Sequence, residues 1–153
     1  MTDVHSPEAR SRNMRAIKSK NTRPEMILRS GLHRRGLRFR IHPKDLPGKP
    51  DLVFAKFGAV IFVHGCFWHG HSCPLFKMPA TRVDFWMSKI TANQTRDSRD
   101  AAGLSALGWR VATVWECALK GRGKLPVPTV IDELVKWLHD PQAEAIELRS
   151  AIV

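Results

Sequence analysis

The chain has 153 residues, of which 43% are hydrophobic and 25% are charged. That length and balance fit one globular domain with a hydrophobic core, and they argue against a disordered tail or a multidomain protein. No apolar run approaches the roughly 20 residues of a membrane helix, and the N-terminus carries no secretory signal. We therefore expect a cytoplasmic protein without a membrane partner.

The net charge is +11, and the basic excess is concentrated at the start of the chain. Residues 1–50 hold 13 Lys and Arg against 4 Asp and Glu, whereas residues 51–153 hold 12 against 10. A positive segment of this kind suits a phosphate backbone, although an anionic membrane or an acidic protein would also fit. Charge alone therefore indicates an anionic partner without identifying it.

The first part of the chain carries two helix-start signals. Ser6-Pro7-Glu8 opens a basic helix expected over residues 7–18, whose narrow apolar stripe makes residues 1–20 a basic arm. Thr22-Arg23-Pro24-Glu25 repeats the signal as a capping box. A second helix is therefore expected from this point to Gly36, where a glycine stops it.

Hydrophobic patterns after Gly36 predict further strands and helices. We expect strands over residues 37–41, 51–54, 59–63 and 109–115, and helices over residues 81–107 and 129–139. A short turn at residues 56–58 makes the second and third strands an antiparallel hairpin. This order predicts a single α/β domain over residues 21–140, with helices flanking a central mixed sheet, followed by a C-terminal tail over residues 141–153.

The segment HGCFWHGHSC at residues 64–73 concentrates cysteine, histidine and aromatic side chains. Thiolate and imidazole are the ligands that zinc prefers, and a closed structural site takes four of them. The cysteines are too few for a disulfide framework, and they supply three zinc ligands: Cys66, Cys73 and Cys117. His69 or His71 is the fourth. The alternative is that Cys117 is an ordinary buried thiol.

Two acids and two histidines are candidates for hydrolytic chemistry. Asp51 opens a buried strand, and His64 closes the neighbouring one. Together with Glu25 and His69 they provide the groups needed to bind Mg²⁺ and to activate water for attack on a phosphodiester. Each also has a structural interpretation: Asp51 as a turn former, Glu25 as half of a capping box, and the histidines as packed side chains.

Phe67 and Trp68 lie inside the cysteine-rich segment. They either pack in a small satellite core or form a rigid aromatic wedge that inserts between base pairs, a step that costs least at a mismatch. Trp86, with Lys89 one turn further on, is another candidate for this wedge. A tryptophan in a helix more often belongs to the core, so Trp86 has both interpretations.

Six motifs occur in order along most of the chain: MRAIKSKNTRPE at 14–25, PGKPDLVF at 47–54, HGCFWHGHSC at 64–73, PATR at 79–82, LGWRV at 107–111 and VWECAL at 114–119. Together they resemble the very short patch repair (Vsr) DNA mismatch endonuclease family. The resemblance implies a restriction-endonuclease-like fold of the PD-(D/E)xK type with a structural zinc site. It also implies an enzyme that nicks one strand of double-stranded DNA next to the T of a T·G mismatch, the lesion left when 5-methylcytosine deaminates.

The resemblance assigns catalytic roles to individual residues. It implies that Asp51 binds a catalytic Mg²⁺, assisted by the backbone carbonyl of Val63, and that His69 is the general base. His64 and Glu25 would support the water shell of the metal and the leaving side of the reaction. Asp51, His69, His64 and Glu25 lie within the matched motifs, and Val63 directly precedes the motif at 64–73.

The resemblance also implies binding roles. The zinc ligands would be Cys66, His71, Cys73 and Cys117. An aromatic wedge of Phe67, Trp68 and Trp86 would enter the major groove while the N-terminal helix around Met14 grips the minor groove. Apart from the resemblance, the basic charge of the arm makes Arg15 and Lys18 candidate DNA-binding residues, and Lys89 is a further candidate because it lies one turn after Trp86. Mismatch-repair proteins and a cytosine-5 methyltransferase system are expected partners of a monomeric enzyme.

Two places depart from the family pattern. Val63 stands where threonine is common, which is tolerable if only its carbonyl binds metal, and Gly70 and Ser72 interrupt what is often a run of histidines. Two other functions compete with the mismatch endonuclease: a zinc-stapled DNA-binding protein without cleavage activity, and a restriction-type nuclease of matched duplexes. Asp51 and His69 favour an enzyme, because a protein that only binds DNA has no use for a carboxylate that repels phosphate.

Overall fold

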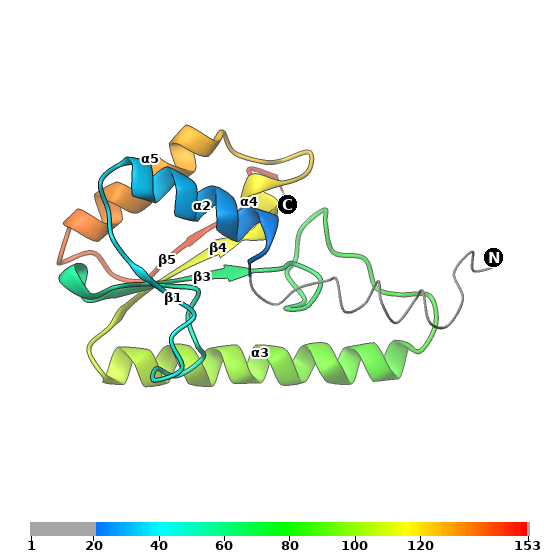
Figure 1. The fold of residues 1–153 in the computed structure, drawn as a ribbon. Helices are drawn as coiled ribbons and strands as arrows, with labels where there is room; N and C mark the ends of the chain where they lie inside the picture. The colour runs from blue at the N-terminus through cyan, green and yellow to red at the C-terminus, as the bar shows by residue number, and fades with distance from the viewer. Residues whose placement is uncertain (1–20, 153) are drawn as a thin grey trace.

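The computed structural model describes residues 21–152, so the expected basic arm over residues 1–20, with Met14, Arg15 and Lys18, lies outside the described residues. The described chain forms one five-stranded sheet with helices on both faces (Figure 1). The strand order is β1-β2-β3-β4-β5, with antiparallel pairing from β1 to β3 and parallel pairing from β3 to β5. The predicted α/β class and mixed sheet are therefore confirmed. None of the described helices is long and apolar enough to cross a membrane.

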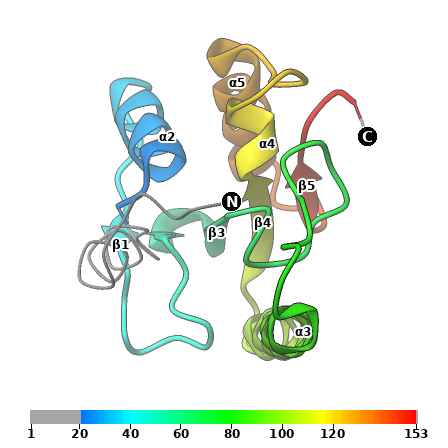
Figure 2. The same cartoon turned by 90° about the vertical axis from the view of Figure 1, so that its right-hand side faces the viewer.

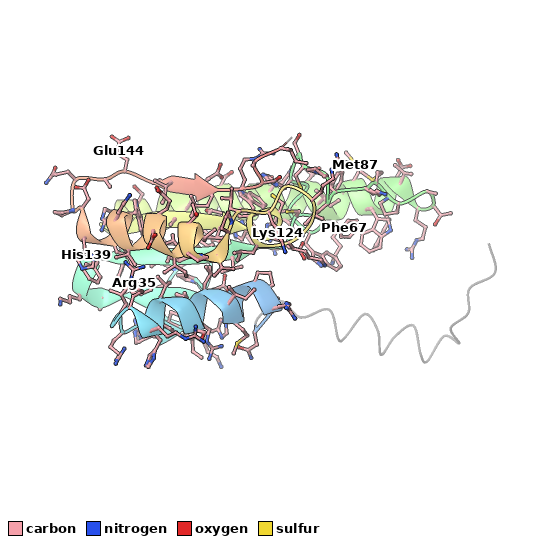
Figure 3. All side chains as sticks on the ribbon, turned by 90° about the horizontal axis from the view of Figure 1, so that it is seen from above. Arg35, Phe67, Met87, Lys124, His139 and Glu144 are labelled. Carbon is pink, nitrogen blue, oxygen red and sulfur yellow. The ribbon has the colours of Figure 1, made fainter. Side chains whose placement is uncertain are left out.

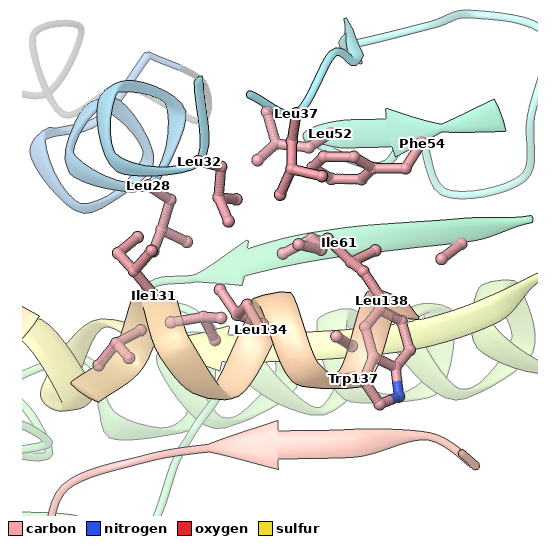
Figure 4. Packing of buried hydrophobic residues seen from close by; sticks show 14 of the residues in the cluster. Leu28, Leu32, Leu37, Leu52, Phe54, Ile61, Ile131, Leu134, Trp137 and Leu138 are labelled. Carbon is pink, nitrogen blue, oxygen red and sulfur yellow. The ribbon is translucent and has the colours of Figure 1, made fainter. Parts of the chain in front are cut away.

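The domain has three layers, as Figures 1 and 2 show. Helices α2 (Arg23–Arg34) and α5 (Val127–His139) cover one face of the sheet, and the long helix α3 (Val83–Ala106) runs along the other. The larger core lies between the sheet and the first two helices, where Leu32 and Leu134 pack in one cluster with Phe54 (Figure 4). Helix α3 buries only two of its 24 side chains, so most of its length is accessible to a partner.

Local sequence explains where α2 begins and ends. The Thr22 hydroxyl accepts a hydrogen bond from the backbone N–H of Glu25 at 3.4 Å, and Pro24 lies in the first turn. The helix ends beside Arg35, and Gly36 follows with a φ of +84°, which glycine adopts without strain. The predicted start and stop are confirmed, and Glu25 is buried in the first turn.

Strands β2 (Leu52–Phe54) and β3 (Ala59–His64) form the predicted antiparallel hairpin, joined by a short 3-10 helix η1 (Ala55–Phe57). Strand β1 (Arg40–Ile41) is shorter than the strand predicted over residues 37–41. If the antiparallel register of β1 continued, Phe39 would lie opposite Phe54, the last residue of β2, and residues 37–38 would lie opposite η1, where no strand is available for pairing. The apolar side chains of residues 37–39 pack into the larger core instead.

The segment predicted as a tail over residues 141–153 joins the sheet, so the prediction of a domain ending at residue 140 is corrected. Strand β5 (Ile146–Leu148) pairs in parallel with β4 (Arg110–Trp115), after the short helix α4 (Glu116–Leu119) and α5. Three residues give too short a pattern to predict a strand. The strand forms because β4 offers an edge for it to pair with.

Candidate functional site

Two parallel strands bring the cysteine-rich segment together with the chain after β4. The last residues of β3 and β4, His64 and Trp115, are paired in the register of the sheet. Cys66 and Cys117 each follow two residues later. Parallel pairing therefore places these two cysteines side by side although they lie far apart in the sequence.

Four soft ligands converge at this edge and form what we call the cysteine cluster: Cys66, His71, Cys73 and Cys117. One ligand atom from each lies within 4.8 Å of all the others. The Nδ1 atom of His71 is 3.6 Å from the Sγ of Cys117, and its ring stacks on Trp115 with centroids 3.9 Å apart. The sequence spacing allowed either His69 or His71 as the fourth ligand, and the geometry therefore favours His71.

The chemistry of the cysteine cluster fits a tetrahedral zinc ion. Burial raises the pKa of the Cys66 and Cys117 thiols, which disfavours their thiolate forms when no metal is bound. The backbone N–H of Ser150 donates to the Sγ of Cys117 at 3.2 Å, a contact that favours a thiolate. Zinc requires deprotonated cysteines, and four protein ligands leave no open position for water. A zinc ion held here would be structural.

A second group, which we call the carboxylate cluster, joins Glu25, His42 and Asp51. The Oδ2 of Asp51 accepts a hydrogen bond from the backbone N–H of Val63 at 2.7 Å. The Nε2 of His42 lies 2.8 Å from Glu25 Oε2 and 3.8 Å from Asp51 Oδ1. Glu25 is 1% exposed and Asp51 8% exposed, so two carboxylates share a buried position.

Burial raises the pKa of Asp51 from 3.8 to about 7, and the neighbouring Glu25 carboxylate adds to this, while the hydrogen bond from Val63 opposes it. Arg29 Nη1 lies 3.4 Å from Glu25 Oε2 and balances one of the two carboxylates. A divalent cation beside Asp51 would stabilise the second carboxylate in its charged form. Carboxylate and carbonyl oxygens are the ligands that Mg²⁺ prefers. The residues present therefore fit the Mg²⁺ site expected at Asp51 and Val63.

Two histidines and an aspartate form a third group beside the end of β3. The rings of His64 and His69 stack with centroids 3.9 Å apart and an interplanar angle of 7°. The Nδ1 of His69 hydrogen-bonds to the Oδ2 of Asp97 on α3. Burial, reinforced by the nearby His69, lowers the pKa of His64 from 6.5 to about 3, so His64 is neutral at neutral pH. With its Nδ1 engaged, His69 has its Nε2 left to take a proton.

His42 and Asp97 are the members of these groups that the sequence analysis missed. His42 carried no motif, and its position opposite Asp51 follows from the pairing of Ile41 with Leu52 in the β1–β2 ladder. Asp97 had no sequence signal, because it lies in a long polar helix whose position against residues 64–73 depends on the folded structure.

The aromatic side chains predicted to form a wedge do come together, in what we call the aromatic cluster. Ring centroids are 5.2 Å apart for Phe67 and Trp68, 5.4 Å for Phe67 and Trp86, and 5.9 Å for the two tryptophans. All three are half-buried, and Lys89 is exposed on the same helix as Trp86. Figure 3 shows Phe67 at the opposite end of the domain from His139.

One groove connects these groups. Its lining includes Asp51, His64, His69, Trp68 and Trp86. Basic side chains in the lining outnumber acidic ones by seven (Arg23, Lys44, Lys49, Arg96, Arg99, Lys120 and Lys124) to five (Asp51, Asp97, Asp100, Glu116 and Glu147). A basic groove with aromatic side chains is typical of nucleic-acid binding, and the adjoining carboxylates and histidines are groups that hydrolytic enzymes use. The fold and the groove together define a small α/β protein suited to hydrolysing a nucleic acid.

Comparison with known proteins agrees with this class. The family described as DNA mismatch endonuclease Vsr matches residues 2–75. The chain is 50% identical over 145 residues to the DNA mismatch endonuclease Vsr of Escherichia coli strain K12, which covers 95% of this chain and 93% of that protein. The chain therefore belongs to the Vsr family of DNA mismatch endonucleases.

Two further relatives have names that describe nicking enzymes. The chain is 56% identical over 125 residues to the type II nicking enzyme V.XorIIP of Xanthomonas oryzae pv. oryzae, covering 82% of this chain and 92% of that protein. It is 44% identical over 122 residues to the type II nicking enzyme V.NmeAIP of Neisseria meningitidis, with coverages of 80% and 87%. The chain is accordingly a strand-specific DNA endonuclease.

Proposed function

We propose that this endonuclease nicks one strand of double-stranded DNA next to the T of a T·G mismatch, in a reaction that depends on Mg²⁺. The observation that carries the proposal is that Asp51, the His64–His69 stack and the aromatic cluster line one basic groove. The relatives named as a mismatch endonuclease and as nicking enzymes support a mismatched substrate and cleavage of one strand. The mixed sheet is compatible with a restriction-endonuclease-like fold of the PD-(D/E)xK type.

Asp51 and the carbonyl of Val63 are the proposed ligands of Mg²⁺, which when bound would polarise the scissile phosphate and stabilise the charge that develops on it. The N–H of Val63 orients the Asp51 carboxylate. Glu25 is held at the start of α2 by the backbone N–H of Asn21 at 3.0 Å and adds negative charge beside the site. This charge favours a divalent cation over a monovalent one.

His69 is the proposed general base, taking the proton of the attacking water at its Nε2. The hydrogen bond to Asp97 fixes the ring tautomer and stabilises the imidazolium that forms. His64 is neutral and stacked on His69, so it holds the ring plane without adding a positive charge that would lower the basicity of His69. The side-chain amide of Gln94 also donates to the backbone carbonyl of His69, at 3.0 Å.

Phe67, Trp68 and Trp86 are the proposed wedge that enters the DNA at the mismatch, where unstacking costs least. The side-chain amide of Asn93 on α3 donates a hydrogen bond to the backbone carbonyl of Trp68 at 2.8 Å, which links the loop that carries Trp68 to this helix. A zinc ion on the four residues of the cysteine cluster would further stiffen the loop that carries Phe67 and Trp68.

Binding to DNA away from the mismatch is assigned to the basic side chains. Lys89 and the arm residues Arg15 and Lys18 would contact phosphates, and Met14 would contact the minor groove. We propose a monomeric cytoplasmic enzyme whose partners are mismatch-repair proteins and a cytosine-5 methyltransferase system. These partners follow from the T·G lesion, which arises at methylated cytosine.

A nicking assay tests this function. A duplex with one T·G pair and a labelled T strand is incubated with the protein, with and without Mg²⁺, and with the Asp51→Ala variant. We expect a nick beside the T only with Mg²⁺ and the wild-type protein, while Asp51→Ala binds the duplex as well or better because a carboxylate near phosphate is removed. Full activity of Asp51→Ala would contradict the metal assignment.

A further inference from the structure

The loop between α4 and α5, which we call the basic loop, carries three basic side chains: Lys120, Arg122 and Lys124. All three are exposed. The chain has no acidic residue over positions 117–131, so the neighbouring sequence does not balance this charge. Lys120 Nζ lies 3.6 Å from Glu116 Oε2, which partly balances one of the three charges. The basic loop is therefore a concentrated positive surface to which neither the catalytic groups nor the aromatic cluster gives a role.

Backbone hydrogen bonds hold the basic loop in a tight turn. The N–H of Lys124 donates to the carbonyl of Gly121 at 3.3 Å, so the loop forms a turn with Arg122 at its second position. The N–H of Leu125 donates to the carbonyl of Ala118 at 2.7 Å and ties the end of the turn back to α4. The turn therefore keeps the basic side chains close to one another.

Two glycines anchor the basic loop against other parts of the domain. Gly121 has a φ of +90°, which glycine adopts without strain, and a Cβ atom added there would lie 2.9 Å from Leu75 Cδ2 in the loop after β3. Gly123 is buried, and a side chain there would clash with Ser150 in the segment after β5. The carbonyl of Gly123 accepts a hydrogen bond from the N–H of Ala151 at 2.8 Å. A loop held in this way loses little conformational entropy when it binds a partner.

The basic loop adjoins the groove that holds the catalytic groups. Lys120 and Lys124 line this groove together with Asp51. Figure 3 shows Lys124 toward the same end of the domain as Phe67, with His139 at the other end. A duplex that presents a phosphate to Asp51 therefore lies in the same groove as two lysines of the basic loop.

We propose that the basic loop binds phosphates of the substrate duplex on one flank of the T·G pair, as a contact separate from the N-terminal arm. Side chains that neutralise phosphates release the counterions condensed on DNA, so this contact adds affinity that does not depend on base sequence. The inference rests on the proposed function for the place of the T·G pair alone, because the chain belongs to a family of DNA endonucleases. The competing role is that of a charged surface that aids solubility and does not touch DNA.

The salt dependence of binding tests the basic loop by itself. Affinity for a matched duplex is measured without Mg²⁺ between about 50 and 200 mM salt. The wild-type protein is compared with a loop variant that combines Lys120→Gln, Arg122→Gln and Lys124→Gln. The slope of log affinity against log salt should become shallower by about two to three units in this variant, because each neutralised phosphate contributes about 0.9 units. Lys124→Gln alone, a single exposed change, should make the slope shallower by about one unit.

A control variant separates phosphate contacts from the effect of net charge. It combines Arg34→Gln, Lys56→Gln and Lys136→Gln, which removes three exposed charges that do not line the groove. Its net charge equals that of the loop variant, but its salt slope should change by less than about one unit. Melting temperatures establish that each variant is folded.

Neutral methylphosphonates, placed one at a time along a T·G duplex, locate the contact. A phosphate that the basic loop binds should cost the wild type affinity when it is neutralised, and should cost the loop variant almost nothing because the partner charge is already missing. We expect such positions to form a short run on one flank of the T·G pair. The control variant should behave as the wild type does at these positions.

Two results would overturn the inference: an unchanged salt slope in a folded loop variant or in Lys124→Gln, or methylphosphonate losses that are the same in the loop variant and the wild type at every position. Either would leave the basic loop as a charged surface without a DNA contact. Failure of the proposed function would look different. A protein that does not prefer the T·G duplex, or that needs no Mg²⁺, would still show the shallower salt slope of the loop variant on a matched duplex.

Discussion

His69 and Asp97 form a hydrogen-bonded pair that joins the loop after β3 to the middle of α3. The contact engages Nδ1 of the imidazole, so the ring can take a proton only at Nε2. The stacked ring of His64 holds His69 from one side. Helix α3 therefore sets both the tautomer and the orientation of the proposed base.

Asp97→Asn should slow nicking by roughly 10²–10⁴-fold with little change in DNA affinity, because an amide no longer stabilises the imidazolium or fixes its tautomer. Single-turnover nicking rates and a binding titration measure the two effects. Asp132→Asn is the matched control, since Asp132 lies on α5 in an exposed ion pair with Arg35.

The His69–Asp97 pair predicts that the losses of nicking rate caused by substituting each residue are not additive. Because Asp97 acts through His69, the double variant with His69→Ala should be no slower than His69→Ala alone. Losses that multiply in the double variant would show that Asp97 acts independently of His69.

The purified protein should contain about one zinc ion per chain. Cys117→Ser and His71→Ala should lower both the zinc content and the melting temperature, because the free energy of metal binding contributes to folding. His69→Ala should keep its zinc, since His69 pairs with Asp97 rather than with the thiols. Elemental analysis and thermal melts provide the readouts, and zinc loss in His69→Ala with retention in His71→Ala would mean that the two roles are exchanged.

Mg²⁺ affinity should fall as pH decreases below about 7, because the pKa of Asp51 is raised to about 7 by burial and the cation must displace the proton. The fall should approach tenfold per pH unit for one proton. Isothermal titration calorimetry between pH 5.5 and 8 measures this effect. A pH-independent affinity would contradict the assignment of Asp51 as the ligand.

The same pKa predicts the pH dependence of stability without Mg²⁺. A proton bound more tightly by the folded state stabilises it fully below pH 3.8, and this stabilisation is lost as the pH rises to about 7. Asp51→Asn should therefore melt at a higher temperature than the wild type at pH 8, with a smaller difference near pH 4. A pH-independent difference between Asp51→Asn and the wild type would count against a raised pKa.

Trp68→Ala should weaken binding to a T·G duplex more than to a matched duplex, because insertion is favourable only where unstacking is cheap. The affinity ratio should shrink while the salt dependence of binding stays the same. Neutralising Arg15 and Lys18 should instead make the salt dependence of binding shallower, by up to about two units of slope. The ratio of the affinities for the T·G and matched duplexes should stay unchanged. Equal losses on both duplexes would show that Trp68 only packs within its loop.

Much of the fold followed from local signals. Thr22 and Gly36 mark the ends of α2, and the turn at Gly58 sets the β2–β3 hairpin. Strand β5 escaped prediction because three residues carry too little pattern and pair only where β4 leaves an edge. Strand β1 is shorter than predicted because its length depends on how far β2 extends, and the alternating pattern of residues 37–41 carries no information about β2.

Part of the candidate site also followed from local sequence signals, and part depended on the folded structure. Cys66, His71 and Cys73 are close in sequence, and the parallel register adds Cys117. His42 faces Asp51 through strand pairing, which follows from register rather than from a motif. Asp97 reaches His69 only because α3 runs along one face of the sheet and passes beneath the loop after β3, and no local pattern encodes that contact.

The most direct test of the mismatch specificity is the nicking rate on a T·G duplex compared with the matched C·G duplex, with each strand labelled in turn and Mg²⁺ present. The account predicts one nick, beside the T and in that strand alone, and little or no cleavage of the C·G duplex. Equal cleavage of both duplexes, or cuts in both strands, would contradict it and identify a restriction-type nuclease instead.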